Sequence, residues 1–349
     1  MTESEKPVGI GIVGSGFMGR TYAEVVSKYV EGARLVGVTA GTRAAQLASD
    51  YGCKCFGSLK ELLAAKNLDA VFIATPHHRH AKEALAAAKA GKHLLIEKPM
   101  ACTVADCDTI VDACRSQGLR CSIGFSQRTR VCNVKAKELL DSGRIGKIRH
   151  IHTYQTVPGG MPNLPAWQSD GRNMGTLFGH GIHNFDMIRW LTGEEIETVY
   201  AKCRSTDSDL KTEGTSDVLM TLEDGTTAYF LCSFQLSPPG FPRSQFTVQA
   251  ICERGLLDID AYGEARASIE GAPWETIATQ PPIDWQGKGF LDPVRLEAYI
   301  AHVSDFVSSI VEKRAPTITA WDGRQAVAAA LAAYESSRTG RQIVLETSP

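Results

Sequence analysis

The feature that most constrains this chain is the sequence Gly14-Ser15-Gly16-Phe17-Met18-Gly19, which directly follows the apolar run Val8–Val13. Between a strand and a helix, the first glycine permits a tight turn and the second lets a phosphate approach the backbone. The third lets the helix pack closely on the strand. The helix N-terminus would offer free N–H groups to the anion. A purely structural glycine turn is the alternative, but this context predicts a dinucleotide site at residues 14–19.

The first 125 residues alternate apolar runs with helical stretches. The further runs are Leu35–Val38, Ala70–Ala74, Leu94–Ile96 and Cys121–Ile123, with a weaker one at Lys54–Phe56. Continuous apolar runs are typical of strands buried on both faces of a parallel sheet. Ser58 with Glu61, and Thr103 with Asp106, have the spacing of capping boxes at helix starts. Residues 1–125 are therefore predicted to form an open, doubly wound α/β domain.

The pattern changes after residue 125. Helices are expected at 133–140, 176–191, 293–312 and 323–337, a strand at 148–157, several strands within 198–260, and a loop at 271–290. Strands that follow one another without intervening helices favour an antiparallel or mixed sheet. Residues 126–349 are therefore predicted to form a second, α+β domain with a large, mostly antiparallel sheet.

Composition narrows the functional classes. The net charge is −2, so nothing attracts the chain to nucleic acid or anionic lipid. No apolar run approaches the roughly 18 residues of a membrane-spanning helix. The first six residues lack the pattern of a secretion signal, so a cytoplasmic location is expected. The ten cysteines include no Cys-x-x-Cys pair, which predicts reduced thiols and no structural zinc site.

The end of the second predicted strand bears on the choice between NAD and NADP. An acidic residue at this point usually binds the ribose 2′-hydroxyl of NAD. Here the chain reads Val38-Thr39-Ala40-Gly41-Thr42-Arg43, without an acid. Thr42 and Arg43 are suited to bind a 2′-phosphate, which favours NADP. The alternative is that Arg43 only precedes the next helix.

Two further motifs concern the site, one directly after a predicted strand and one within a predicted helix. Glu97-Lys98-Pro99 comes directly after Ile96, at the sheet edge where α/β folds bind ligands. Gly181-x-His183-x-x-Asp186 lies in the 176–191 helix. Together with the glycine turn, Thr75-Pro76 with His80, and Ser142-Gly143-x-Ile145-Gly146, these motifs occur in an order that resembles the Gfo/Idh/MocA oxidoreductases over nearly the whole chain.

This resemblance implies an N-terminal Rossmann domain and a nicotinamide cofactor. It also implies oxidation of a secondary alcohol of a sugar, sugar derivative or cyclitol, or the reverse reduction. It makes Lys98 the catalytic acid/base and His183 its partner. It assigns Thr75, Pro76, His77, His80, Glu97, Lys98 and Arg128 to cofactor binding. His80 is also expected to open the helix that follows it. It further implies a homodimer or homotetramer built on the second domain's sheet.

The chemistry of Lys98 agrees with this role. Oxidation of a carbinol needs a base within about 3 Å of the hydroxyl oxygen. A free lysine, with a pKa of about 10.4, is a poor base at neutral pH. Burial beside a positively charged ring would lower this pKa, and in the reduction Lys98 would donate the proton. A surface lysine with a solvated tip is the alternative.

The chain departs from the family pattern at Gly179, where the family usually has an aspartate four residues before the histidine. His180 is adjacent and is predicted to replace the missing acid. His180 and His183 lie three apart on one helical face, which would suit a metal, but no third ligand accompanies them and no metal is expected. Gln155 and Trp167 are weaker candidates for substrate contact, and Asp186 is expected to bond within its helix.

Three alternatives to a sugar or cyclitol dehydrogenase remain open. The first is a dihydrodiol dehydrogenase that aromatises a cyclic diol. The second is a redox-neutral lyase or glycosidase that oxidises a sugar carbon transiently with bound NAD, since His180-Gly181 resembles a pair found in related glycosidases. The third is a cofactor-binding sensor that has lost activity at Gly179.

Overall fold

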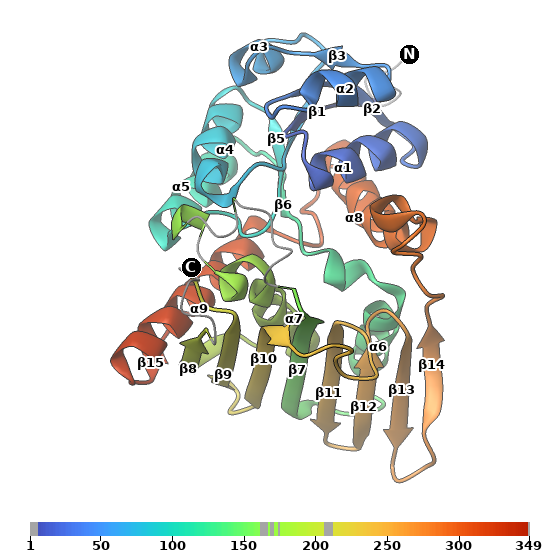
Figure 1. Ribbon diagram of the computed structural model, residues 1–349, viewed down its shortest axis with the longest axis vertical. Coiled ribbons are helices and arrows are strands. Elements are labelled where there is room, and N and C mark those ends of the chain that lie inside the picture. The colour runs from blue at the N-terminus through green and yellow to red at the C-terminus, as the bar shows by residue number, and fades with distance from the viewer. Residues whose placement is uncertain (1–5, 161–166, 168–170, 174, 206–211, 348–349) are drawn as a thin grey trace. The chain divides into compact units, whose positions relative to one another are not determined.

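The computed structural model describes residues 6–160, 167, 171–173, 175–205 and 212–347, and it divides into two compact units (Figure 1). Unit 1 comprises the chain up to residue 126 together with 283–324, and unit 2 comprises 127–282 and the chain from 325 onward. The sequence predicted one boundary near 125, with 126–349 as the second domain. Segment 283–324 instead returns to unit 1, because its helix buries Leu296, Val303 and Phe306 in the core of that unit.

Unit 1 is built on a six-stranded parallel sheet in the order β3-β2-β1-β4-β5-β6. The strands are β1 (Val8–Val13), β2 (Ala33–Thr39), β3 (Lys54–Cys55), β4 (Ala70–Ile73), β5 (His93–Ile96) and β6 (Cys121–Ile123). Every residue of β1, β4 and β6 is buried, as strands covered on both faces require. The strand order reverses between β1 and β4, which is where such sheets bind ligands.

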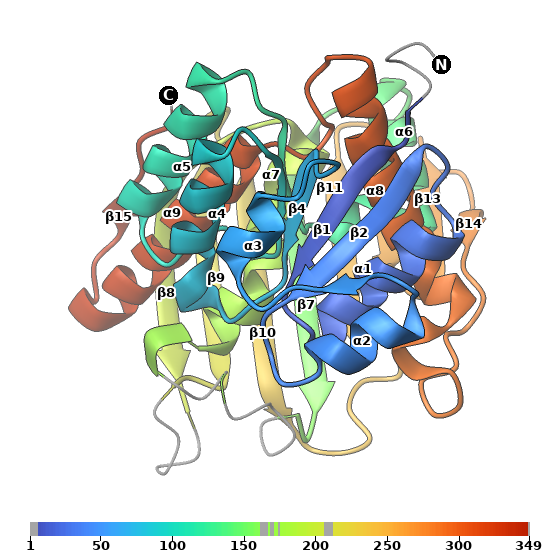
Figure 2. The same ribbon diagram turned by 90° about the horizontal axis from the view of Figure 1, so that it is seen from above.

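Helices flank this sheet on both faces, with α4 and α5 on one and α1 and α8 on the other (Figures 1 and 2). The helices are α1 (Phe17–Lys28), α2 (Ala44–Asp50), α3 (Leu59–Leu63), α4 (His80–Lys89), α5 (Val104–Ser116) and α8 (Pro293–Val311). Both predicted capping boxes are confirmed. The Ser58 hydroxyl accepts the Glu61 N–H at 3.2 Å, and the Thr103 hydroxyl accepts the Asp106 N–H at 3.1 Å.

Unit 2 is built on a nine-stranded sheet in the order β14-β13-β12-β11-β7-β10-β9-β8-β15. The strands are β7 (Ile148–Pro158), β8 (Ile196–Arg204), β9 (Thr215–Leu222), β10 (Thr227–Leu236), β11 (Phe246–Cys252), β12 (Gly255–Asp260), β13 (Glu264–Ile269), β14 (Glu275–Thr279) and β15 (Ile343–Val344). Among the pairs that these described strands form, β7–β10 is the only parallel one, which confirms the predicted, mostly antiparallel sheet. The expected loop at 271–290 contains β14, a largely exposed strand at one end of the sheet that has no apolar face to reveal it.

Three helices belong wholly or mainly to unit 2: α6 (Val131–Asp141), α7 (Ile182–Thr192) and α9 (Ala320–Thr339). Helix α6 packs on β12–β14, and α7 packs on β7. The predicted helix at 176–191 is present, but its first part, Leu177–Gly181, is a π-helix that runs directly into α7. His180 lies in the π-helix and His183 in α7, and residues 177–192 are called the histidine segment below.

Candidate active site

The glycine turn joins β1 to α1 as predicted. Gly14 has φ = +118°, and a Cβ there would lie 2.3 Å from the Ala74 carbonyl oxygen. A Cβ on Gly19 would lie 2.0 Å from the Gly14 carbonyl oxygen. A Cβ on Gly16 would meet no atom within 4 Å, so the space beside it is open. Because this open backbone lies at the N-terminus of α1, the turn fits the diphosphate of a dinucleotide.

The loop after β2 lies against this turn. The Ser15 hydroxyl accepts the backbone N–H of Arg43 at 3.2 Å, and a Cβ on Gly41 would lie 2.4 Å from the same oxygen. Thr42 and Arg43 are exposed, and Arg43 directly precedes α2. Both residues therefore lie beside the predicted dinucleotide site and are exposed to a ligand. Arg43 also lies directly before α2, as the alternative interpretation of this residue requires.

The loops after β4 and β5 are neighbours, since Ile73 pairs with Ile96 at the ends of these strands. Thr75 is buried, and its hydroxyl donates to Glu83 Oε2 at 2.5 Å. Lys98, two residues past Ile96, is half-buried. The strand pairing thus brings the Thr75-Pro76 and Glu97-Lys98-Pro99 motifs to one edge of the sheet, and His77 lies in the turn after Pro76.

Glu97 is buried inside unit 1. The Tyr22 hydroxyl donates to Glu97 Oε1 at 2.6 Å, and the Lys98 backbone N–H donates to Oε2 at 3.2 Å. Burial raises the pKa of Glu97, and these donors together with Lys98 and Arg295 oppose the rise. The carboxylate thus helps to hold the backbone at Lys98. Tyr22 was not foreseen from the sequence, because nothing local marks a partner 75 residues away.

His80 begins α4, as the sequence predicted, and its ring is fully buried. The ring lies between two backbone carbonyls, those of Thr75 and Pro99. It therefore contacts both motif loops at once.

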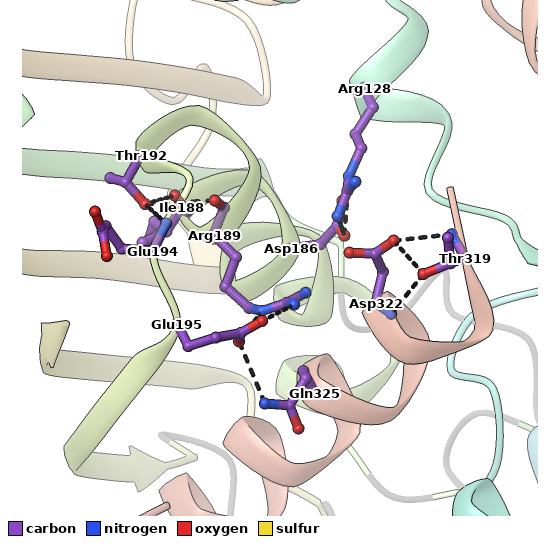
Figure 3. A network of polar contacts seen from close by, with 10 residues as sticks. All are labelled: Arg128, Asp186, Ile188, Arg189, Thr192, Glu194, Glu195, Thr319, Asp322 and Gln325. Atoms are coloured by element: carbon purple, nitrogen blue, oxygen red, sulfur yellow. Dashed lines mark hydrogen bonds and ion pairs between the residues drawn. The ribbon is translucent and has the colours of Figure 1, made fainter. Parts of the chain in front are cut away.

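In unit 2, Arg128 and Asp186 form a buried, two-point ion pair (Figure 3). Arg128 Nε lies 2.9 Å from Asp186 Oδ2, and its Nη2 lies 2.5 Å from Oδ1. Asp186 thus bonds to a residue outside its helix, since Arg128 comes from the 3₁₀ turn Ser126–Thr129. Two N–H···O bonds fix both side chains, so Arg128 anchors α7 at Asp186.

The segment that carries the histidines is held at its start by Glu213. This carboxylate accepts the Leu177 N–H at 2.7 Å and the Tyr334 hydroxyl at 2.9 Å. Burial raises the pKa of Glu213, and these two bonds oppose the rise. His183 is buried on α7, while the His180 ring is half-buried with its centroid 4.5 Å from that of Phe234. Neither Glu213 nor Tyr334 carries a sequence signal for this role.

The two weaker candidates differ in their surroundings. Gln155 is buried on β7, and its Oε1 accepts from Asn184 Nδ2 of α7 at 3.3 Å, so it lies beside the histidine segment. Trp167 is exposed, and its carbonyl accepts from Asn173 Nδ2 at 2.7 Å. The structure thus groups Arg128, Gln155 and His183 around α7. Lys98 belongs to unit 1, so the catalytic roles of Lys98, His183 and His180 stay predictions.

The ten cysteines all lie within the described residues, and none is in a disulfide. Burial raises the pKa of Cys102 to about 11, and burial also raises the pKa of Cys107, so both remain thiols at neutral pH. Among the described helices, none has the length and apolar character needed to cross a bilayer.

A parallel sheet of this order with a glycine turn at its switch point defines a dinucleotide-binding α/β fold, here joined to a second, mostly antiparallel unit. Residues 8–125 match the model described as "Oxidoreductase family, NAD-binding Rossmann fold", and residues 133–258 match the "GFO/IDH/MocA C-terminal domain". The chain belongs to the Gfo/Idh/MocA family of oxidoreductases, which confirms both the predicted fold class and the resemblance.

Two relatives are similar to this chain over nearly its whole length, and a third is similar over about half of it. Inositol 2-dehydrogenase 2 of Saccharopolyspora erythraea is 27% identical over 97% of this chain and 96% of that protein. The solved scyllo-inositol dehydrogenase of Lactobacillus casei, with bound NAD(H) and scyllo-inositol, is 26% identical. Its TM-score is 0.80, covering 97% of this chain and 99% of that one. A 2,7-anhydro-N-acetylneuraminate hydratase of Mediterraneibacter gnavus is 29% identical over 56% of this chain and 52% of that protein.

Proposed function

We propose that this oxidoreductase is a dehydrogenase or reductase acting on a secondary alcohol or ketone carbon of a sugar, sugar derivative or cyclitol. The observation that carries the proposal is the place of Lys98, half-buried after β5 at the carboxyl edge of the parallel sheet. The full-length similarity to an inositol 2-dehydrogenase supports the substrate class.

A bound nicotinamide cofactor supplies the hydride acceptor or donor. Lys98 removes the hydroxyl proton of the substrate in the oxidation and returns it in the reduction. Its backbone N–H is held by Glu97, which limits the movement of the loop from which the side chain extends. His183, held on α7, positions the hydroxyl or passes the proton onward, and His180 assists in place of the acid missing at Gly179.

We take NAD as the proposed cofactor. The family model and the solved scyllo-inositol dehydrogenase both name NAD, and neither supports the preference for NADP that the 39–43 sequence favoured. Gly14, Ser15, Gly16, Phe17, Met18 and Gly19 would hold its diphosphate, with Thr75, Pro76 and His77 nearer to the nicotinamide.

The test is a nicotinamide-absorbance screen with purified protein over sugars, cyclitols and cyclic diols, with NAD and NADP in parallel. Substrate-dependent formation of free reduced cofactor from a polyol supports the proposal. Turnover confined to cyclic diols with an aromatic product would point instead to a dihydrodiol dehydrogenase. Tight cofactor binding without turnover of any substrate would point to a sensor.

A redox-neutral reaction is the second candidate. It is favoured by Gly179, where the usual acid is missing, and by the similarity of about half of the chain to a hydratase. In such a reaction the cofactor is restored in every cycle. Consumption of a glycoside or anhydro-sugar, followed by chromatography, with no net change in reduced cofactor would establish it.

We also propose self-association through the open face of the unit 2 sheet. Tyr200, Leu219, Tyr229 and His152 pair in one row across β8, β9, β10 and β7. Leu219 is 50% exposed, as is Val311 on α8 of unit 1. Leu219→Lys should lower the mass measured by light scattering to that of a smaller assembly, while the control Val311→Lys leaves it unchanged. Equal masses for both variants would contradict the proposal.

A further inference from the structure

His80 lies between the two loops that carry the Thr75-Pro76 and Glu97-Lys98-Pro99 motifs. Its Nε2 is 2.7 Å from the Thr75 carbonyl oxygen, and its Nδ1 is 2.8 Å from the Pro99 carbonyl oxygen. The ring has no exposed surface. Both ring nitrogens therefore contact the main chain of a motif loop, and the side chain is directed away from solvent.

The chemistry of these two contacts limits how the ring can be protonated. A carbonyl oxygen only accepts hydrogen bonds, whereas a neutral imidazole has a single N–H. One ring can bond to both carbonyls only when each nitrogen carries a proton. Burial, the largest effect, lowers the pKa of His80, and the two carbonyl bonds oppose this. The neutral ring thus donates to one carbonyl, and acidification adds the second bond.

The groups around the ring come from several elements. The positive charge of Lys98, on the loop after β5, and of His78, in the turn before α4, also lowers the pKa of His80. His77 lies with its ring centroid 5.9 Å from that of His80. On α4, Glu83 is buried, and its carboxylate is shared between the Thr75 hydroxyl and Arg79. Glu83, the carboxylate nearest to His80 in the sequence, is thus already paired with Arg79.

We propose that His80 is a positioning residue for the reaction, and this rests on the proposed function. A planar ring with two rotatable bonds, packed on all sides, sets the separation of the Thr75 and Pro99 carbonyls. Pro99 directly follows Lys98, so a shift of the Pro99 carbonyl moves the backbone from which the Lys98 side chain extends. His80 thereby sets the place of the Lys98 amine relative to the loop expected beside the nicotinamide. Misplacement by about 1 Å can cost about a hundredfold in rate.

The test compares His80→Phe with His302→Phe. Phenylalanine keeps an aromatic ring of similar size and removes both nitrogens. His302 is also fully buried in unit 1, and its Nε2 lies 2.9 Å from the hydroxyl of Ser122 on β6. Each variant is compared with the wild type in melting temperature, NADH affinity, kcat and KM.

His80→Phe should lower kcat about tenfold or more, with substrate KM within about threefold. His302→Phe should lose a similar amount of thermal stability and keep kcat within about twofold. If the two variants lose kcat equally, or if His80→Phe keeps full kcat, His80 only fills space and the proposal fails.

A second measurement does not depend on turnover or on the folding of His80→Phe. In ¹⁵N-histidine-labelled wild type and His302→Phe, the slowly exchanging ring that remains in the variant is assigned to His80. At pH values above the pKa of His80, this ring should show one protected N–H. At pH values below that pKa, it should show two. A ring that keeps a single N–H at every pH would mean that His80 does not bond to both carbonyls, and it would overturn the proposal. A chain that turns over no substrate but shows both protons refutes the proposed function alone.

Discussion

Glu97 in unit 1 and Asp186 in unit 2 are both buried carboxylates, and their charges are stabilised in different ways. Glu97 accepts from a tyrosine hydroxyl and a backbone N–H, whereas Asp186 receives a two-point bond from Arg128. Burial without a directly paired cation raises the pKa of Glu97. The loop at Lys98 is thus held by neutral donors, and the histidine helix is held by charge.

The difference shows how each unit holds its own candidate residues. The Lys98 loop is placed by the pairing of β4 with β5, and Glu97 and His80 adjust it locally. The histidine segment depends on Arg128 at one point and on Glu213 at its start, and both lie far from it in sequence. Substitutions around Lys98 in unit 1 should therefore change the rate, and substitutions around α7 in unit 2 should change stability as well.

The largest effect on rate should come from Lys98→Ala. Losing the acid/base should lower kcat by about a thousandfold, since general acid–base catalysis contributes about 10² to 10⁴. NADH affinity, measured by fluorescence titration, should stay within about threefold. A variant that retains turnover would refute the assignment of Lys98.

Asp186→Ala should give the largest loss of stability. Asp186→Ala removes the two-point partner of the buried Arg128, and breaking a buried ion pair typically costs about 3–5 kcal/mol. The exposed pair Lys135–Glu138, at 2.6 Å, provides the control, and Glu138→Ala should cost less than about 1 kcal/mol. Urea unfolding measures both. If Asp186→Ala costs no more than the control, the Arg128 pair does not anchor α7.

His180→Ala tests whether this residue replaces the acid missing at Gly179. The rate should fall about tenfold, which is smaller than the Lys98 effect because His180 assists and does not act as the primary acid/base. The kcat of the variant is measured beside that of the wild type. An unchanged rate would leave His180 a packing role against Phe234.

Arg43→Ala should have a smaller effect and concerns the cofactor alone. If the exposed guanidinium binds a 2′-phosphate, NADP affinity should fall about fivefold while NAD affinity hardly changes. The exposed Arg34 on β2 offers a control substitution in the same unit. Equal losses for NAD and NADP would leave Arg43 with no more than its place before α2.

The smallest expected effect is on the pH dependence of the free energy of unfolding. A carboxyl whose pKa is raised in the folded state binds its proton more tightly there than in the unfolded chain. The wild type should therefore gain stability relative to Glu97→Gln as the pH falls through the raised pKa of Glu97 towards its ordinary value of 4.5. Urea unfolding at several pH values measures the slope. An identical slope for both proteins would mean that Glu97 titrates as in the unfolded chain.

Much of the fold was predictable because its signals are local. The strand at Val8–Val13, both capping boxes and the start of α4 at His80 follow from runs and spacings of a few residues. Strand β14 was missed, because an exposed strand at the end of a sheet carries no apolar alternation. The return of 283–324 to unit 1 was also missed, since an amphipathic helix does not say which core it covers.

The sequence by itself determined where strands, helices and the glycine turn lie, and that Lys98 follows a core strand. These properties depend on backbone sterics, side-chain periodicity and short-range hydrogen bonds, which act within one turn or strand. Only the tertiary structure decided that Tyr22 holds Glu97, that Arg128 holds Asp186, and that Glu213 and Tyr334 hold the histidine segment. Such pairs form between residues that the folded chain brings together, and no local spacing encodes them.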